Sequence, residues 1–145
     1  MNVKFNGYYS EEDINCMPSS SGVYVVYRGK PTNPREFDPI KIIYIGKAAN
    51  LQQRIKNHDK YDNFKRALYN GEELYFSCAL VSGVAELDAI ENALICSQSP
   101  ALNEVLVDNF KREISDFNIS GACALVDPHP WKLKEPFTIT VAESQ

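Results

Sequence analysis

The stretch Lys41–His58, KIIYIGKAANLQQRIKNH, decides the fold, because three kinds of local structure follow one another within it. Lys41–Ile45 is rich in β-branched and aromatic residues, which predicts a strand, and Gly46 ends that strand. Asn50 is then placed to cap a helix that runs to about the end of the stretch, with Gln53 at the capping-box position. A strand, a glycine turn and a helix are therefore expected in immediate succession.

The same stretch opens a basic region in an acidic chain. Residues 41–66 contain seven bases and two acids, a net charge of +5, which leaves −9 for the remainder of a chain whose net charge is −4. Phosphate contacts need Lys and Arg, so this segregation favours a polyanionic partner, although lysine-rich helix surfaces also occur without one. The bases are Lys41, Lys47, Arg54, Lys56, Lys60, Lys65 and Arg66.

Length and composition predict one globular domain. The chain has 145 residues, of which 44% are hydrophobic, enough for a packed core. No apolar run reaches the roughly 20 residues of a membrane helix, and the N-terminus lacks the apolar region of a signal peptide. We therefore expect a cytoplasmic protein with no membrane partner. The four cysteines match no zinc spacing and no CxxC motif, and are expected to be reduced thiols.

The residues before the opening stretch predict a lead-in and one strand. Ser10 is placed to cap a short helix, because acids follow it in the first turn. Val23–Tyr27 predicts a strand with Tyr24 and Val26 on one face. Arg28–Pro39 contains three prolines and is expected to be a polar loop. The simplest arrangement is an antiparallel hairpin in which this loop joins the two strands.

Downstream, a helix, a strand and a longer helix are expected. Asp62 or Asn63 is placed to cap a second helix that ends at Asn70 before a glycine. Leu74–Val81 predicts a third strand. Ala85–Ser97 shows the clearest helical periodicity. Its apolar face is formed by Leu87, Ile90 and Leu94.

The C-terminal part is less regular. A loop and a short helix are expected over Leu102–Phe117, and short strands over Ala122–Val126 and Phe137–Val141. The segment between these strands is a proline-rich turn that carries Trp131. Trp131 could contact a protein partner or fill the core over the sheet, and the second is the commoner role of a tryptophan.

Glu91 is the most informative candidate for chemistry. It lies four residues after Leu87 and three before Leu94, so it shares the core-facing side of its helix. A carboxylate there is costly unless it is paired or binds a metal. Arg54 and His58 likewise share a face of their own helix. A metal-binding carboxylate, an Arg and hydroxyl donors such as Tyr24 and Tyr44 suit phosphodiester cleavage, although each tyrosine alone is more often a core residue.

The order of these residues resembles the GIY-YIG nuclease family. The motif residues are Gly22-Val23-Tyr24, then Tyr44-Ile45-Gly46, then Arg54, Glu91 and Asn103. The stretches YIGKAANLQQRI and IENALICSQSPALNE are especially similar to the N-terminal cleavage domain of the bacterial excision-repair nucleases. The resemblance covers about residues 18–104. It leaves residues 1–17 as a lead-in and 105–145 as a C-terminal extension of a single domain.

This resemblance implies an α/β fold of the α+β type, with a small central three-stranded antiparallel sheet flanked by helices. It implies one divalent ion, Mg²⁺ or Mn²⁺, with Glu91 as its sole protein ligand. Tyr44 is favoured over Tyr24 as the general base. The implied catalytic residues are Tyr24, Tyr44, Arg54, His58, Glu91 and Asn103, and Lys47, Lys56 and Lys60 are the expected substrate-binding residues.

The expected function is that of a metal-dependent endonuclease that cuts DNA in repair or restriction. The acidic net charge and the absence of a second DNA-binding domain favour the alternative of a non-catalytic module that binds nucleic acid or protein on the same scaffold. The complete set of motif residues favours the enzyme. A protein partner or a second copy of the chain could bind through the C-terminal extension.

Overall fold

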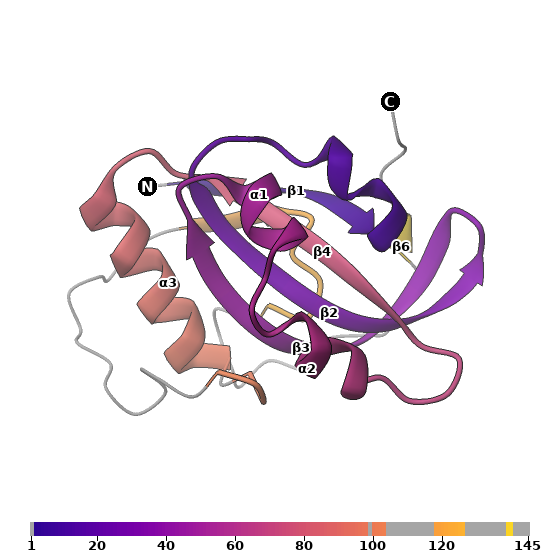
Figure 1. Ribbon diagram of the computed structural model, residues 1–145. Helices are drawn as coiled ribbons and strands as arrows, with labels where there is room; N and C mark the ends of the chain where they lie inside the picture. Colours follow the sequence, from indigo (N-terminus) through magenta and orange to yellow (C-terminus); the bar gives the residue numbers. More distant parts are fainter. Residues whose placement is uncertain (1, 99, 104–117, 127–138, 141–145) are drawn as a thin grey trace.

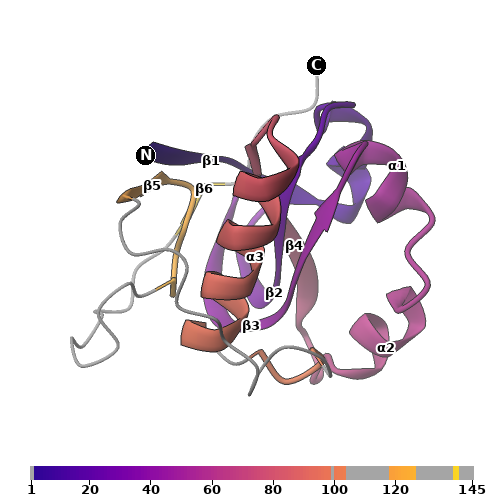
Figure 2. The same cartoon turned by 90° about the vertical axis from the view of Figure 1, so that its left-hand side faces the viewer.

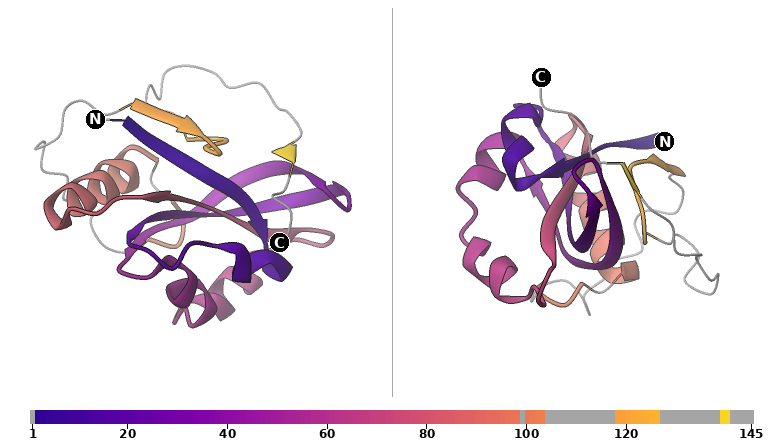
Figure 3. Two further views of the ribbon diagram at one scale, coloured as in Figure 1. Left: turned by 90° about the horizontal axis from the view of Figure 1, so that it is seen from above. Right: turned by 90° about the vertical axis from the view of Figure 1, so that its right-hand side faces the viewer.

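The computed structural model describes residues 2–98, 100–103, 118–126 and 139–140. Its centre is one curled sheet with the strand order β5-β1-β4-β2-β3-β6 (Figures 1 and 3). The strands are β1 (Asn2–Ser10), β2 (Gly22–Asn33), β3 (Glu36–Ala48), β4 (Glu73–Leu80), β5 (Asn118–Gly121) and β6 (Ile139–Thr140). The helices are the 3₁₀ helix η1 (Glu11–Cys16), α1 (Leu51–Lys56), α2 (Tyr61–Arg66) and α3 (Val84–Gln98). The mixed α/β class is confirmed, but the expected sheet of three strands is too small.

The two faces of the sheet carry separate hydrophobic clusters, as the alternation in β2 predicts. Val25 and Tyr27 point into one cluster, which α3 closes with Ile90 and Leu94. Tyr24 and its neighbours on the same face point into the other, which α1 and α2 close. Figure 2 shows α3 on one side of the sheet and the two short helices on the other. The residues of the candidate site come from the sheet and from the helices on both of its sides.

The expected loop over Arg28–Pro39 is wrong, because β2 and β3 continue through it as a long hairpin. Their pairing runs from Gly22 opposite Ala48 to Asn33 opposite Glu36 and is interrupted by register shifts. β4 pairs with β2 only as far as Gly29, so Pro31 lies beyond the point where its missing N–H would break a hydrogen bond to β4. Prolines therefore did not mark a loop here.

The lead-in contains a strand that was not expected, because Asn2–Ser10 forms β1 before the expected short helix. Val3 and Phe5 are buried while Lys4 between them is exposed, which is the alternation of a strand with one face in the core. β1 pairs with β4. The helix after it is 3₁₀, and the Ser10 hydroxyl donates to Asp13 rather than capping a backbone N–H.

The helices follow the sequence with small shifts. The Asn50 side chain accepts from the Gln53 N–H at 3.0 Å, which confirms the predicted cap of α1. α2 begins at Tyr61, so neither Asp62 nor Asn63 caps it, and it ends at Arg66, four residues before the expected end at Asn70. The strand predicted over Leu74–Val81 and the helix predicted over Ala85–Ser97 are confirmed within one residue at each end as β4 and α3.

Part of the C-terminal extension belongs to the core. β5 pairs with β1 in parallel, and the Ala124 N–H donates to the Tyr8 hydroxyl at 2.7 Å. The strand expected over Ala122–Val126 is wrong, since these residues form turns, yet Val126 is buried. Of the strand expected over residues 137–141, β6 is described and pairs with β3. The expected helix before residue 117 and Trp131 lie outside the described residues.

Two further findings concern membrane spans and disulfides. Within the described residues, no helix combines the length and apolar character that a membrane span requires. Cys16, Cys78 and Cys123, the cysteines whose side chains are described, form no disulfide.

Candidate active site

The two motif glycines are required by close packing. Gly46 lies opposite Tyr24 in the β2–β3 ladder, and a Cβ atom on Gly46 would fall 2.3 Å from the Tyr24 hydroxyl. A Cβ on Gly22 would fall 2.0 Å from the Ala79 carbonyl oxygen of β4. Both distances are far below van der Waals contact. The glycines therefore allow the Tyr24 ring and β4 to approach the backbone of the hairpin.

Tyr24 and His58 form the buried centre of the site. Tyr24 is fully buried on β2, and its hydroxyl lies 2.7 Å from His58 Nε2. His58 lies just after α1 and packs against Phe64 of α2, with ring centroids 4.8 Å apart. The buried residues Leu51 and Ile55 fix α1 against the sheet. The turn after α1 can therefore place an imidazole over the tyrosine.

His58 is neutral at physiological pH. Burial, helped by the positive charges of Arg54 and Lys60, lowers the pKa of His58 from 6.5 to about 4. Its Nδ1 accepts the backbone N–H of Lys60 at 3.1 Å. The proton of the neutral ring is therefore on Nε2, so His58 donates the hydrogen bond to the Tyr24 oxygen. The Asp59 carboxylate is 3.5 Å from Nδ1 but is largely solvated, with 71% of its side chain exposed.

Tyr44 lies beside this pair but is more open. Its ring stacks on Tyr24 with centroids 6.2 Å apart and meets His58 edge-on at 5.2 Å. Tyr44 is half-buried where Tyr24 is fully buried. Burial raises the pKa of both hydroxyls, and the nearby Arg54 guanidinium opposes this for both. Both hydroxyls therefore keep their protons at neutral pH in the free protein.

Arg54 reaches the tyrosines from α1 and is also held by an acid. Its Nη1 lies 3.2 Å from the Asp59 carboxylate, and 36% of its side chain is exposed. The guanidinium is thus close enough to lower the pKa of the tyrosine hydroxyls and still open to solvent. An incoming phosphate could take the place of Asp59, because a guanidinium binds both groups through the same fork of donors.

Glu91 is half-buried at the edge of the site on α3. Only 13% of its side chain is exposed, and burial raises the pKa of its carboxyl, with the Lys47 ammonium opposing the rise. Lys47 Nζ lies 4.0 Å from Glu91 Oε1 and hydrogen-bonds Asp88 one turn earlier on the helix. The charge of Glu91 also raises the pKa of Tyr24 and Tyr44. The carboxylate therefore belongs to the same electrostatic site as the tyrosines.

Glu91 could offer a carboxylate oxygen to a metal ion. Among the described residues no group of three or more His, Cys, Asp or Glu side chains could enclose an ion. Glu91 has a desolvated carboxylate whose nearest cation is 4.0 Å away. Such an oxygen donor suits Mg²⁺, which keeps several waters and takes one or two carboxylates from the protein.

Asn103 forms hydrogen bonds with the backbone of β3. Its side chain accepts from the Ile45 N–H at 2.9 Å and donates to the Ile45 carbonyl at 2.8 Å. The Leu102 N–H also donates to the Ile43 carbonyl at 3.0 Å. The loop after α3 therefore supplies hydrogen-bond partners to the backbone of β3 at the residue between Tyr44 and Gly46. Asn103 positions this motif and does not point at Tyr24 or Arg54.

The expected substrate-binding lysines do not form one group. Lys47 lies between Asp88 and Glu91 inside the site. Lys56 is exposed on α1 and, being two residues from Arg54, points about 200° around the helix from it. Lys60 precedes α2 and contributes its backbone N–H to His58.

Two acids that were not among the predicted site residues hold the basic groups of the site. Asp59 pairs with Arg54, and Asp88 pairs with Lys47. Asp88 had a readable signal, because it lies three residues before Glu91 and so shares its helix face. Asp59 had no such signal, because it follows the end of α1 and the turn there sets the direction of its side chain.

Two comparisons with known proteins give a match. The model of the GIY-YIG catalytic domain matches residues 22–103. UvrABC system protein C of Aster yellows witches'-broom phytoplasma (strain AYWB) is 30% identical over 99 residues, which is 68% of this chain. The match spans 15% of the length of that relative. No solved structure matches the chain. The family match covers more than half of the chain and includes Tyr24, Tyr44, Arg54, Glu91 and Asn103, so the chain belongs to the GIY-YIG family.

Proposed function

We propose that this chain is an endonuclease that hydrolyses a phosphodiester bond of DNA with one divalent cation. The observation that carries the proposal is the convergence of four groups from separate elements. The Tyr24 hydroxyl is held by His58, Arg54 lies against it, and the half-buried Glu91 carboxylate acts on the same hydroxyl. A core that needed only packing would not require an Arg, a neutral His and a desolvated carboxylate around one buried hydroxyl.

Arg54 and Lys47 are the proposed phosphate-binding groups. Both are partly exposed, and each is held by an aspartate that also faces solvent. Binding of a phosphate would replace these acids with the non-bridging oxygens of the scissile group. Arg54 would then fix the orientation of the phosphate, because its donors lie in one plane.

Tyr44 is the proposed general base. A general base must reach the attacking water, and Tyr44 is half-buried whereas Tyr24 is enclosed. The hydrogen bond from His58 leaves the Tyr24 oxygen as an acceptor, which orients the Tyr24 hydroxyl proton away from the imidazole. In this proposal Tyr24 and His58 orient Tyr44 through the stacked rings, and Arg54 eases loss of the Tyr44 proton to solvent. The Tyr44 oxygen then accepts a proton from the attacking water.

Glu91 is the proposed protein ligand of the cation, Mg²⁺ or Mn²⁺. When bound, the cation supplies charge neutralisation of the phosphate and of the leaving oxygen. Lys47 Nζ lies 4.0 Å from the same carboxylate and would move toward the phosphate if Glu91 held the ion. Membership of a nuclease family supports this role, and the residues present fit it.

A plasmid nicking assay tests the proposal. The purified chain is expected to convert supercoiled DNA to the nicked form with Mg²⁺ or Mn²⁺ and to lose this activity with a chelator. Glu91→Ala is expected to abolish nicking while its circular dichroism spectrum stays unchanged. Nicking that persists in Glu91→Ala, or that needs no metal, would overturn the proposal.

A non-catalytic nucleic-acid-binding module is the second candidate. It is favoured by the two ion pairs that already occupy Lys47 and Arg54 and by the net charge of −4. Such a module would bind DNA with an affinity that falls steeply with salt and would not nick it under any metal condition. Binding without nicking across both metals would therefore favour this candidate over the enzyme.

A further inference from the structure

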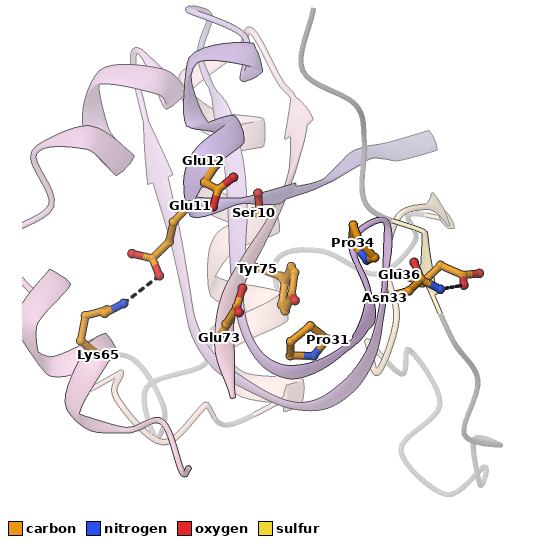
Figure 4. A pocket seen from close by; sticks show the side chains of 10 residues that line it. All are labelled: Ser10, Glu11, Glu12, Pro31, Asn33, Pro34, Glu36, Lys65, Glu73 and Tyr75. Carbon is orange, nitrogen blue, oxygen red and sulfur yellow. Dashed lines mark hydrogen bonds and ion pairs between the residues drawn. The ribbon is translucent and has the colours of Figure 1, made fainter. Parts of the chain in front are cut away.

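A second concave site lies at the other end of the sheet, beneath the tip of the β2–β3 hairpin. Its volume is about 580 Å³, within the usual range for ligand sites. Figure 4 shows the hairpin tip on one side of this site, and the end of β1 with the start of η1 on the other. The lining residues used below are Glu11, Glu12, Glu36, Lys65, Glu73 and Tyr75.

We call this site the hairpin pocket. Its lining is acidic, and two of its carboxylates have no partner within the described part of the chain. The one base in its lining, Lys65, is paired with Glu11 at 2.8 Å. Glu11 also accepts from the Tyr61 hydroxyl at 2.5 Å. Glu12 and Glu73 have no hydrogen-bond or ion-pair partner within the described part of the chain. The pocket therefore keeps a negative charge that its own lysine does not neutralise.

Tyr75 gives an independent indication of a ligand. Its side chain lines the pocket and is only 2% exposed, and its ring stacks on Phe37 with centroids 3.8 Å apart. Its hydroxyl finds no hydrogen-bond partner among residues 2–98, 100–103, 118–126 and 139–140. Figure 4 places the Tyr75 hydroxyl in the pocket near Glu73 and Pro31. The rest of the side chain is enclosed and the hydroxyl opens into the pocket, so its hydrogen-bond partner has to come from the pocket, where a ligand could supply it.

The chemistry of the pocket selects a cation that carries several N–H donors. Glu12 and Glu73 offer acceptors alone, and the Tyr75 oxygen can accept a further bond. A guanidinium or ammonium group has only donors, and its charge complements the two open carboxylates. We propose that the hairpin pocket binds such a group, carried by an Arg or Lys side chain of a protein partner or by a polyamine.

This site is separate from the candidate active site. Tyr75 belongs to the hydrophobic cluster that includes Tyr27, and Tyr24 belongs to the cluster on the opposite face of the sheet. The negative charge of the pocket also repels a DNA backbone. Binding in the pocket therefore does not compete with binding of a phosphate at Arg54, and the proposal does not depend on nuclease activity.

Calorimetric titration of the full chain tests the proposal with two probes. One probe is the capped peptide Gly-Arg-Arg-Gly and the other is spermidine, with capped Gly-Glu-Glu-Gly as the probe of opposite charge. At least one cationic probe is expected to bind with a stoichiometry of one, and the acidic peptide is not. Binding of the peptide alone identifies a protein side chain as the source of the cation, and binding of spermidine alone identifies a polyamine.

Matched variants locate the binding. Glu73→Gln combined with Glu12→Gln is expected to weaken it at least about tenfold, the scale of one lost charge-assisted hydrogen bond. Tyr75→Phe keeps the stack on Phe37 and is expected to weaken binding by a smaller factor. The control Glu86→Gln removes one negative charge from an exposed site on α3, against two in the double pocket variant, and should leave the affinity within twofold.

Three results would overturn the proposal. They are no binding of either cationic probe at millimolar concentration, an equal loss of affinity in Glu86→Gln, and unchanged affinity in the pocket variants. Thermal melts of each variant establish that it folds, and its plasmid nicking should match that of the parent chain. Loss of nicking without loss of probe binding would count against the proposed nuclease alone.

Discussion

The Tyr24 hydroxyl accepts a 2.7 Å hydrogen bond from His58 Nε2, and this bond fixes the chemical state of both residues. Because His58 Nδ1 accepts the Lys60 N–H, the ring can be neutral only with its proton on Nε2. Protonation of His58 would place a second donor at Nδ1 against the Lys60 N–H. The bond therefore links the turn after α1 to the centre of the sheet at neutral pH and weakens that link in acid.

The low pKa of His58 predicts a stability that depends on pH. Its pKa is about 4 in the folded chain and 6.5 when unperturbed, so between these values the unfolded chain binds more protons. The contribution of His58 is thus fully present above about pH 6.5 and is lost as the pH falls toward 4. Melting temperatures measured from pH 8 to pH 4 should fall more in the parent chain than in His58→Gln.

The other histidine, His129, supplies the matched control for this measurement. His129→Gln should retain the full acid-induced loss if His58 is its source. An equally flattened pH profile in His129→Gln, or an unchanged profile in His58→Gln, would contradict the assignment.

The two tyrosines should differ in what their hydroxyls contribute to cleavage. Tyr44→Phe removes the proposed base and is expected to lower the rate of nicking by about 100-fold or more. Tyr24→Phe removes an orienting hydrogen bond and leaves the His58 N–H without its partner, so it should lower both the rate and the melting temperature. Single-turnover rates and thermal melts separate the two effects. A larger rate loss in Tyr24→Phe with Tyr44→Phe near parent activity would transfer the role of base to Tyr24.

Asn103 is expected to act through the backbone of β3. Asn103→Ala leaves the N–H and the carbonyl of Ile45 without these partners and should destabilise the fold by about 2 kcal/mol. Denaturant unfolding measures this loss. Asn63→Ala, at an exposed position of α2, is the control and should change stability by less than about 0.5 kcal/mol. Equal stability of the two variants would show that the hydrogen bonds of Asn103 do not stabilise the fold.

The aspartates that pair with Lys47 and Arg54 should restrain DNA binding. Asp88→Asn and Asp59→Asn each free one base and should steepen the dependence of log affinity on log salt by about one unit. Asp62→Asn removes the same charge from an exposed position of α2 without releasing a base. The salt slope of Asp62→Asn should therefore match the parent chain, and a slope as steep as the other two would contradict the role of the ion pairs.

The parts of the fold that the sequence predicted are those with strong local signals. The Asn50 cap, the alternation of Val23–Tyr27 and the periodicity of α3 each rest on residues close together in the chain, and all are confirmed. The extended hairpin could not be predicted, because Pro31 is tolerated in β2 only where β4 has already ended. That condition depends on the register of a strand more than forty residues away.

In the candidate site too, only features with a local sequence signal could be predicted. Glu91 could be identified because a carboxylate in an apolar helix face is locally improbable. The direction of the His58 hydrogen bond could not, since it depends on a backbone N–H two residues later in a turn. The pairing of Asp88 with Lys47 joins residues that are forty-one positions apart and follows only from the packing of α3 against β3.

A crystal soaked with Mn²⁺ shows whether Glu91 holds the cation of an endonuclease. Anomalous scattering should give one peak about 2.0–2.2 Å from a Glu91 carboxylate oxygen, with waters as the other ligands. The same soak of Glu91→Gln should give no peak there. A peak elsewhere, or none beside Glu91 in crystals of a chain that nicks DNA with Mn²⁺, would show that Glu91 does not hold the cation.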